Sequence, residues 1–334
     1  MISPDIPLAE LHRHLDGSTR LETILELGLT HNLPLPATTI EGLRPYVQVS
    51  TPQPGVMAFI EKFKWMTGVL VDYDACRRIA YENVEDAWQE GIDYIELRYS
   101  PWFMAEAHNL QPAGVVEAVT EGIRAAEREH SILVNQLGIL SRHYGPEIAM
   151  QELDAVLSLA HEFAGLDLAG DEAHFPGELF RDHFQKAHDA GWHITVHAGE
   201  AAGPESIWQA VRELGAERIG HAVRAPEDPA LLDFLGEKGI GIECNLTSNV
   251  QTSTVKDYSS HPMRLFMEKD ILASINTDDP GISAINLHYE YEVAAPKAGL
   301  SPAMIRQAQE NALNSAFLTD DEKAELWRKK AAGV

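Results

Sequence analysis

The sequence predicts an α/β protein folded as a (β/α)8 barrel, because eight short apolar segments alternate with amphipathic helical patterns. Such alternation is typical of parallel strands joined by helices, and eight strand–helix units are enough to close a barrel. An open doubly wound sheet would normally show a Gly-rich phosphate loop after an early strand, and the sequence contains none. The length of 334 residues is one that such barrels reach as one unit. We therefore expect a single domain over residues 1–334.

The expected strands are short and apolar, and turn residues or helical patterns separate them. In chain order they are Leu8–His14, Tyr94–Arg98, Val134–Leu140, Leu166–Gly170, His193–His197, Arg218–Gly220, Gly239–Asn245 and Leu272–Thr277. Most connections carry apolar residues at spacings of three and four, which predicts helices with one buried face. The clearest of these helices are Ala113–Glu129, Glu147–Phe163, Glu205–Leu214 and Pro229–Lys238. Two more, near Pro302–Asn314 and Asp320–Lys330, are expected to complete the structure.

The connection between the first two strands, 17–91, is unusually long for a strand–helix unit. It includes a proline-rich stretch between Pro34 and Pro54, followed by a helical run that contains Phe59, Ile60, Phe63 and Trp65. We therefore expect a helical insertion here. An insertion at the mouth of a barrel can act as a lid over a pocket. A helical hairpin packed on the flank of the barrel is an equally good interpretation.

Composition excludes several classes of function. The 51 acidic and 26 basic residues leave a formal charge of -25, which repels phosphate backbones and argues against a nucleic-acid partner. Cys76 and Cys244 are too few for a disulfide framework or a cysteine-rich zinc site. No apolar segment is long enough to cross a bilayer, and the N-terminus does not resemble a signal peptide. We expect a cytoplasmic protein without a membrane partner, and the oligomeric state is left open.

Histidines and one aspartate stand where predicted strands end. His12 and His14 close the first strand, and residues two apart on a strand point to the same face. His197 closes the fifth strand and Asp278 follows the last. In a barrel these strand ends meet on one rim, where such enzymes place their sites. Imidazole and carboxylate are good ligands for a divalent cation, so the sequence predicts a metal site with a position left open for water.

Three further side chains would lie on the same rim. Glu200 follows the fifth strand within reach of the pocket, His221 closes the sixth, and Asp279 follows Asp278. Glu200 is placed to carry a proton beside the metal, while His221 and Asp279 are placed to orient and deprotonate water. Each residue alone has a simpler interpretation, as a core histidine or a surface carboxylate. Because all of them are expected on the same rim, a role in catalysis is the favoured interpretation.

The sequence favours one metal ion rather than two. Barrels with two metals usually bridge them through a carboxylated lysine at the end of the fourth strand. Here no lysine occurs between Lys64 and Lys186, and the fourth strand reads Leu166-Asp167-Leu168-Ala169-Gly170. We therefore expect one ion per chain.

Five segments, in order along essentially the whole chain, resemble the signature motifs of the adenosine deaminases of the amidohydrolase superfamily, most closely the bacterial enzymes. They are Leu11-His12-Arg13-His14-Leu15-Asp16-Gly17, Asp167-Leu168-Ala169-Gly170-Asp171-Glu172, His197-Ala198-Gly199-Glu200, Ile219-Gly220-His221 and Ser274-Ile275-Asn276-Thr277-Asp278-Asp279-Pro280. The resemblance implies Zn²⁺ as the cofactor, with four ligands: His12, His14, His197 and Asp278. It also implies hydrolytic deamination of adenosine and 2′-deoxyadenosine to inosine and 2′-deoxyinosine plus ammonia, in purine nucleoside salvage.

The resemblance further implies roles toward the substrate. Glu200 would protonate purine N1, while His221 and Asp279 would hold the attacking water. The implied substrate-binding residues are His14, Asp16 at the ribose 5′-hydroxyl, Gly170 at N3 and Asp279 at N7. Phe59, Ile60 and Phe63 resemble the apolar lid helix of the family.

Two positions depart from the family pattern. Ala222 stands where glycine is usual, and Asn245-Leu246 replaces a common Cys-Pro pair. Neither change removes a ligand or a proton carrier, so we expect an effect on rate rather than loss of activity.

Four alternative functions fit the sequence less well. Adenine deaminases tend to carry glutamate where Asp16 stands, and an AMP-type substrate would need a cationic cluster that the motifs lack. A non-catalytic relative would be expected to lose a ligand or a proton carrier. Deaminases of the cytidine type need a pair of zinc-binding cysteines that two separated cysteines cannot supply.

Overall fold

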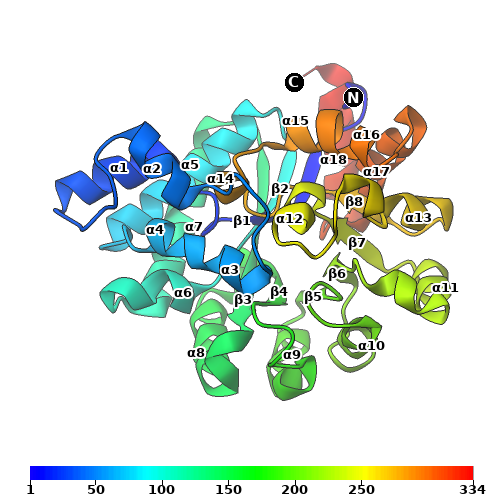
Figure 1. Ribbon diagram of the computed structural model, residues 1–334, viewed down its shortest axis with the longest axis horizontal. Coiled ribbons are helices and arrows are strands. Elements are labelled where there is room, and N and C mark those ends of the chain that lie inside the picture. Colours follow the sequence, from blue (N-terminus) through cyan, green and yellow to red (C-terminus); the bar gives the residue numbers. More distant parts are fainter. Residues whose placement is uncertain (334) are drawn as a thin grey trace.

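The computed structural model describes residues 1–333 and contains the expected barrel. Eight parallel strands form one sheet in the order β1-β2-β3-β4-β5-β6-β7-β8. They are β1 (Ala9–His14), β2 (Tyr94–Tyr99), β3 (Leu133–Ser141), β4 (Phe163–Ala169), β5 (His193–Ala198), β6 (Arg218–His221), β7 (Gly241–Cys244) and β8 (Ala273–Ile275). Figure 1 shows the strands at the centre with helices around them. The predicted fold class is confirmed.

The first and last strands meet just beyond the end of β8. Arg13 and Asp278 form a parallel bridge. The Asp278 N–H donates to the His12 carbonyl at 3.0 Å, and the His14 N–H donates to the Asp278 carbonyl at 2.8 Å. This seam brings the histidines of β1 and the aspartate after β8 to the same point of the rim.

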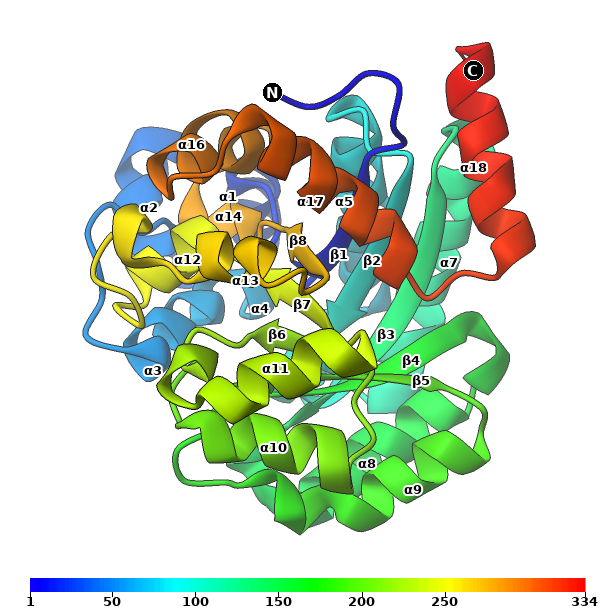
Figure 2. The same cartoon turned by 90° about the vertical axis from the view of Figure 1, so that its right-hand side faces the viewer.

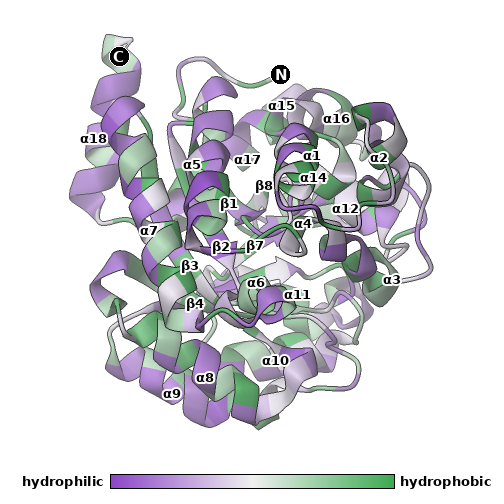
Figure 3. Ribbon diagram, turned by 90° about the vertical axis from the view of Figure 1, so that its left-hand side faces the viewer, coloured by the Kyte–Doolittle hydropathy of each residue, from purple (hydrophilic) through white to green (hydrophobic). Residues whose placement is uncertain are grey.

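Helices surround the barrel (Figure 2). They are α1 (Leu21–Thr30), α2 (Ile40–Val47), α3 (Val56–Ile60), α4 (Lys64–Thr67), α5 (Tyr73–Gln89), α6 (Pro101–Ala105), α7 (Pro112–Glu129), α8 (Gly145–Leu157), α9 (Arg181–Asp189), α10 (Pro204–Glu213), α11 (Pro229–Lys238), α12 (Leu246–Gln251), α13 (Met263–Glu268), α14 (Pro280–Ser283), α15 (Leu287–Tyr289), α16 (Ala295–Lys297), α17 (Pro302–Ser315) and α18 (Asp320–Ala332). The outer helices carry hydrophilic beside hydrophobic residues, as expected for helices with one buried face (Figure 3). Among residues 1–333, no helix combines the length and apolar character needed to span a membrane.

The bounds of some elements differ from those expected. The helix predicted over 147–163 ends at Leu157, and β4 already begins at Phe163 because that residue pairs with Gln136 of β3. The strand predicted over 272–277 is regular only from Ala273 to Ile275. The chain leaves regular strand geometry there, and Asp278 has a positive φ of 67°. Strong apolar patterns locate an element better than they locate its ends.

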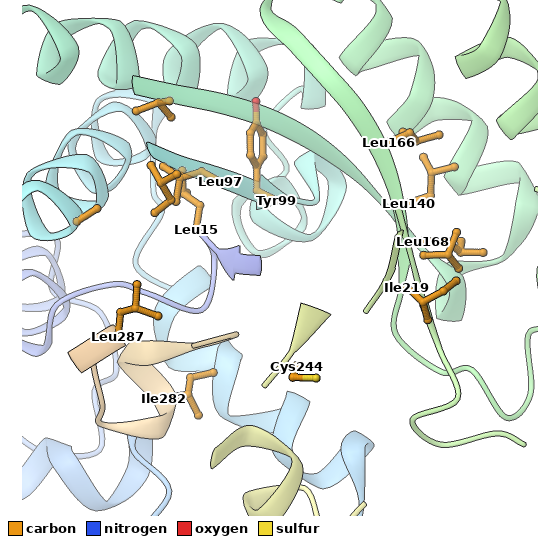
Figure 4. Close-up of a cluster of buried hydrophobic side chains, with 14 of the residues drawn as sticks. Leu15, Leu97, Tyr99, Leu140, Leu166, Leu168, Ile219, Cys244, Ile282 and Leu287 are labelled. Atoms are coloured by element: carbon orange, nitrogen blue, oxygen red, sulfur yellow. The ribbon is translucent and has the colours of Figure 1, made fainter. Parts of the chain in front are cut away.

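The core has an apolar layer and a charged interior. Leu97, Leu168 and Ile219 are buried members of the apolar layer (Figure 4). Arg98 and Arg218 are also almost completely buried on the strands. Buried charges require partners, and these arginines are paired with carboxylates that lead to the rim.

Candidate active site

The structure brings the four predicted metal ligands together. His12 Nε2 lies 3.1 Å and His14 Nε2 lies 3.2 Å from Asp278 Oδ1. His14 Nε2 also lies 3.2 Å from His197 Nε2. Donor atoms that share one ion at bond lengths of about 2.0–2.2 Å stand about 3.0–3.5 Å apart, so these separations suit a shared ion. All four residues are buried.

The opposite edges of two imidazoles are held by carboxylates inside the barrel. His12 Nδ1 donates to Glu243 Oε2 at 2.7 Å, and His197 Nδ1 donates to Asp167 Oδ1 at 3.0 Å. The Arg98 guanidinium ties the two carboxylates together, at 2.8 Å from Asp167 and 3.0 Å from Glu243. Because Nδ1 of each ring donates to a carboxylate, Nε2 is the nitrogen that faces the cluster. This is how proteins orient metal-binding histidines.

The charge of the cluster also suits a cation. His12 Nε2 is buried and makes no hydrogen bond within residues 1–333. Although burial opposes it, the carboxylates of Asp279, Asp16 and Asp278 raise the pKa of His14 well above its ordinary value. Negative charge therefore accumulates where a divalent ion would neutralise it. Two overlapping groups of donors, which share Asp278, could hold such an ion. One consists of His12, His197, His221 and Asp278, and the other of His14, Asp278 and Asp279.

His221 stands beside this cluster, with Nε2 at 3.9 Å from Asp278 Oδ2. Its other ring nitrogen faces a relay of hydrogen bonds. The Met263 backbone N–H donates to His261 Nδ1 at 3.1 Å, so the proton of that neutral ring is on Nε2, 3.2 Å from Asn249 Oδ1. The Asn249 amide nitrogen then donates to His221 Nδ1 at 3.0 Å.

This relay determines which nitrogen of His221 carries hydrogen. Burial lowers the pKa of His221, so the ring is neutral, and Nδ1 accepts a hydrogen bond. The proton is therefore on Nε2, which faces the cluster as a donor rather than as a ligand. In His12 and His197 the nitrogens have the opposite roles, because Nδ1 is the donor and Nε2 faces the cluster without a proton. The site thus contains histidines of two kinds, distinguished by what their Nδ1 atoms contact.

Glu200 lies on the loop after β5, 9% exposed, and lines the same pocket. Its Oε2 is 3.7 Å from His221 Nε2 and its Oε1 is 3.5 Å from Asn249 Nδ2. Burial raises the pKa of Glu200 well above its ordinary value, and the negative charges of Asp278 and Glu172 add to that effect. A carboxyl group that keeps its proton near neutral pH can act as an acid.

The remaining predicted site residues also line the pocket. Asp16 is buried, and its Oδ2 accepts a hydrogen bond from the Ser100 N–H at 3.1 Å. Asp279 packs directly against Gly17, where a Cβ would meet Asp279 Oδ1 at 1.8 Å. Gly170 has a φ of 102°, which favours glycine, and it exposes its backbone to the pocket beside the His143 ring.

The pocket holds about 630 Å³ of space, part of it open to solvent. Val56, Phe59 and Ile60 of α3, together with Phe63 just after it, line one side. The Phe63 ring packs against the Phe103 ring at an interplanar angle of 57°, with ring centroids 5.5 Å apart. An apolar wall therefore faces the polar cluster, as in most small-molecule sites.

Several residues that lie around the site have no role predictable from the sequence. Asp167 and Glu243 carry charge within strands that are otherwise apolar, a pattern that can mark an internal polar network. Asn249 and His261 lie beyond β7 and reach His221 only through the fold. Glu172 was part of a motif, and its contacts become visible only in three dimensions.

Known proteins resemble this chain over nearly its whole length. A family model described as Adenosine deaminase matches residues 7–331. An adenosine deaminase from Photorhabdus laumondii subsp. laumondii is 57% identical over 332 residues, covering 99% of both chains. The crystal structure of an adenine deaminase from Arthrobacter aurescens has a TM-score of 0.90 at 23% identity, covering 98% of this chain and 99% of that one. At that identity the likeness concerns the fold alone.

A solved amidohydrolase from Burkhoderia ambifaria, described with bound Zn, has a TM-score of 0.88 at 25% identity and covers 99% of this chain and 91% of that one. The family model spans nearly the whole chain, and more than half the positions are identical to those of the Photorhabdus relative. The chain belongs to the adenosine deaminase family.

Proposed function

We propose that this protein hydrolytically deaminates adenosine and 2′-deoxyadenosine to inosine and 2′-deoxyinosine plus ammonia. One observation carries the proposal. Four side chains of the kinds that bind metals come together from β1, β5 and the segment after β8, with neighbouring donor atoms 3.1–3.2 Å apart. A buried glutamate lines the same pocket. We further propose that residues 1–334 act as one catalytic domain in purine nucleoside salvage.

The ligands in this proposal are His12, His14, His197 and Asp278, and the ion is one Zn²⁺ per chain. Two observations support this assignment. The imidazoles of His12 and His197 are each held by a carboxylate at Nδ1, and zinc is described for the Burkhoderia ambifaria amidohydrolase. When bound, zinc supplies Lewis-acid polarisation, which lowers the pKa of water to about 7. His221 is excluded from the ligand set because its Nε2 carries the hydrogen.

Protein side chains move the protons in this proposal. Glu200 donates a proton to purine N1, which makes C6 electrophilic. His221 Nε2–H and the Asp279 carboxyl group orient the water that adds to C6. The water oxygen bonds to C6, which becomes tetrahedral, and the bond from C6 to its exocyclic nitrogen then breaks. Of the two protons that the water loses, one converts the departing amino group to ammonia and the other restores the Glu200 carboxyl group, while C6 becomes a carbonyl and N1 keeps its proton. Water excluded by the apolar wall cannot compete for these hydrogen bonds.

We propose the substrate contacts that the family resemblance implies. Asp16 binds the ribose 5′-hydroxyl, the Gly170 backbone meets N3 and Asp279 bonds N7, with His14 also lining the ribose side. Within residues 1–333, the side chains that line the pocket include neither lysine nor arginine, which disfavours a phosphorylated substrate. The segment over 17–91 acts as the lid, because Phe59, Ile60 and Phe63 line the pocket.

A substrate panel tests the proposal. We expect turnover of adenosine and 2′-deoxyadenosine, followed by the change in ultraviolet absorbance on conversion to inosine, with adenine and AMP far slower. Elemental analysis should give one zinc per chain. Faster turnover of adenine, or a zinc-loaded protein that leaves adenosine unchanged, would overturn the proposal.

A further inference from the structure

Glu172 makes an unusual set of contacts in the loop after β4. Its carboxylate accepts hydrogen bonds from four consecutive backbone N–H groups of the loop after β5. Oε1 accepts from Gly199 at 2.6 Å, and Oε2 accepts from Glu200 at 3.1 Å, Ala201 at 2.7 Å and Ala202 at 3.0 Å. Three of these donors share Oε2 and one binds Oε1, so both oxygens of the carboxylate bind this one loop.

The Glu200 side chain has no comparable support of its own. Its nearest side-chain partners are Asn249 Nδ2 at 3.5 Å and His221 Nε2 at 3.7 Å, both at or beyond the limit of a hydrogen bond. Its position therefore depends on the backbone that carries it. That backbone turns at Gly199, where φ is 68°, and nothing regular constrains it before α10 begins at Pro204.

The carbonyl side of the same loop is held by other residues. The Arg142 guanidinium donates to the His197 carbonyl at 2.6 Å, and the Arg224 N–H donates to the Gly199 carbonyl at 2.9 Å. Glu172 is thus the group that satisfies the N–H side. Without it, four adjacent donors would need water or a new loop conformation.

We propose that Glu172 is a positioning residue for the reaction, acting by fixing the 199–202 backbone so that the Glu200 carboxyl group meets the substrate. The inference rests on the proposed function, since it assumes that Glu200 is the proton donor. Glu172 itself touches no substrate atom in this scheme. A displacement of about 1 Å at a catalytic group costs about 10²-fold in rate, so loss of this anchor is felt in kcat.

A double-mutant cycle tests the proposal with adenosine as substrate. Glu172→Gln retains shape but turns one acceptor oxygen into a donor that opposes the backbone N–H groups. We expect kcat to fall about 10-fold in Glu172→Gln and about 10²-fold in Glu172→Ala, while KM stays within about 2-fold. Bound metal, measured by elemental analysis, should equal that of the wild type.

The decisive comparison is made in the Glu200→Gln background. If Glu172 acts only through Glu200, adding Glu172→Gln should change the residual kcat by less than about 2-fold. Asp171→Asn, which alters the neighbouring carboxylate that accepts from the His174 N–H, is the matched control and should leave kcat unchanged. If Glu172→Ala fails to fold, the near-isosteric Glu172→Gln series decides alone.

Three results would overturn the inference: multiplicative losses in the double variant, a rise in KM with unchanged kcat, or loss of metal in Glu172→Gln. Two other results would instead bear on the premises of the inference. A wild-type protein inactive on adenosine would refute the proposed function, and a Glu200→Gln variant of normal activity would remove Glu200 from the mechanism.

Discussion

Glu152 should make the stability of this protein depend on pH. It is completely buried on α8, where it accepts hydrogen bonds from the Ser100 hydroxyl and, at 2.7 Å, from the Ser141 N–H. Burial raises the pKa of Glu152 from its ordinary 4.5 to about 7. The folded protein therefore binds this proton more tightly than the unfolded chain does. Stability from this group is fully present below pH 4.5 and is lost as pH rises through about 7.

The Glu152→Gln variant isolates this effect. The amide oxygen can still accept from the Ser141 N–H, and the amide nitrogen can donate to the Ser100 hydroxyl, so packing and bonding persist without the charge. The pKa change corresponds to about 2.5 kcal/mol of free energy of unfolding lost between pH 5 and pH 8. Urea unfolding across that range should show the wild type losing about that much relative to Glu152→Gln.

Glu147→Gln is the control, because Glu147 is exposed on the same helix and its replacement also removes one charge. The reasoning is refuted if the wild type and Glu152→Gln differ by the same free energy at pH 5 and pH 8. It is equally refuted if Glu147→Gln reproduces the pH-dependent difference.

Three further predictions concern the site. Glu200→Gln should retain metal but lose about 10²–10⁴-fold in kcat, because it cannot donate a carboxyl proton; near-normal turnover would remove Glu200 from the mechanism. Asp16→Ala should raise KM for adenosine while metal content, by elemental analysis, stays the same; equal effects on adenosine and adenine would contradict a ribose contact. His14→Ala should lose bound metal, whereas His221→Ala should keep it and lose rate; metal loss in both variants would place His221 among the ligands.

The fold was predictable because each strand is a short apolar run bounded by a helical pattern. All eight strands occur where expected, and α11 has the predicted bounds of Pro229–Lys238. The end of α8 was wrong by several residues, since the pairing of Phe163 with β3 determines where β4 begins. Such a pairing is a tertiary contact that local periodicity does not contain.

The candidate site was predictable where strand ends alone locate residues on the rim. His12, His14, His197 and Asp278 meet as expected because parallel strands in a barrel share one carboxyl-terminal edge. The difference between His221 and the other histidines could not be predicted in this way. It depends on which groups contact each Nδ1 atom, and those partners come from distant segments of the chain.

The same is true of the support around Glu200. A motif placed Glu172 near the fourth strand, but nothing in its spacing indicates that its side chain reaches across to the next loop. The number of backbone donors it satisfies is a property of two loops packed together.

The seam between β1 and the segment after β8 has a consequence for biosynthesis. Leu11 already bonds to Asn276 across 265 positions of sequence, and His12 and Asp278 are joined through their backbones at the same place. During translation, a nascent chain can form this seam only after Asp278 has left the ribosome. Until then His12 and His14 have no aspartate opposite them, so fragments that end before the last strand should be unable to form the proposed metal site.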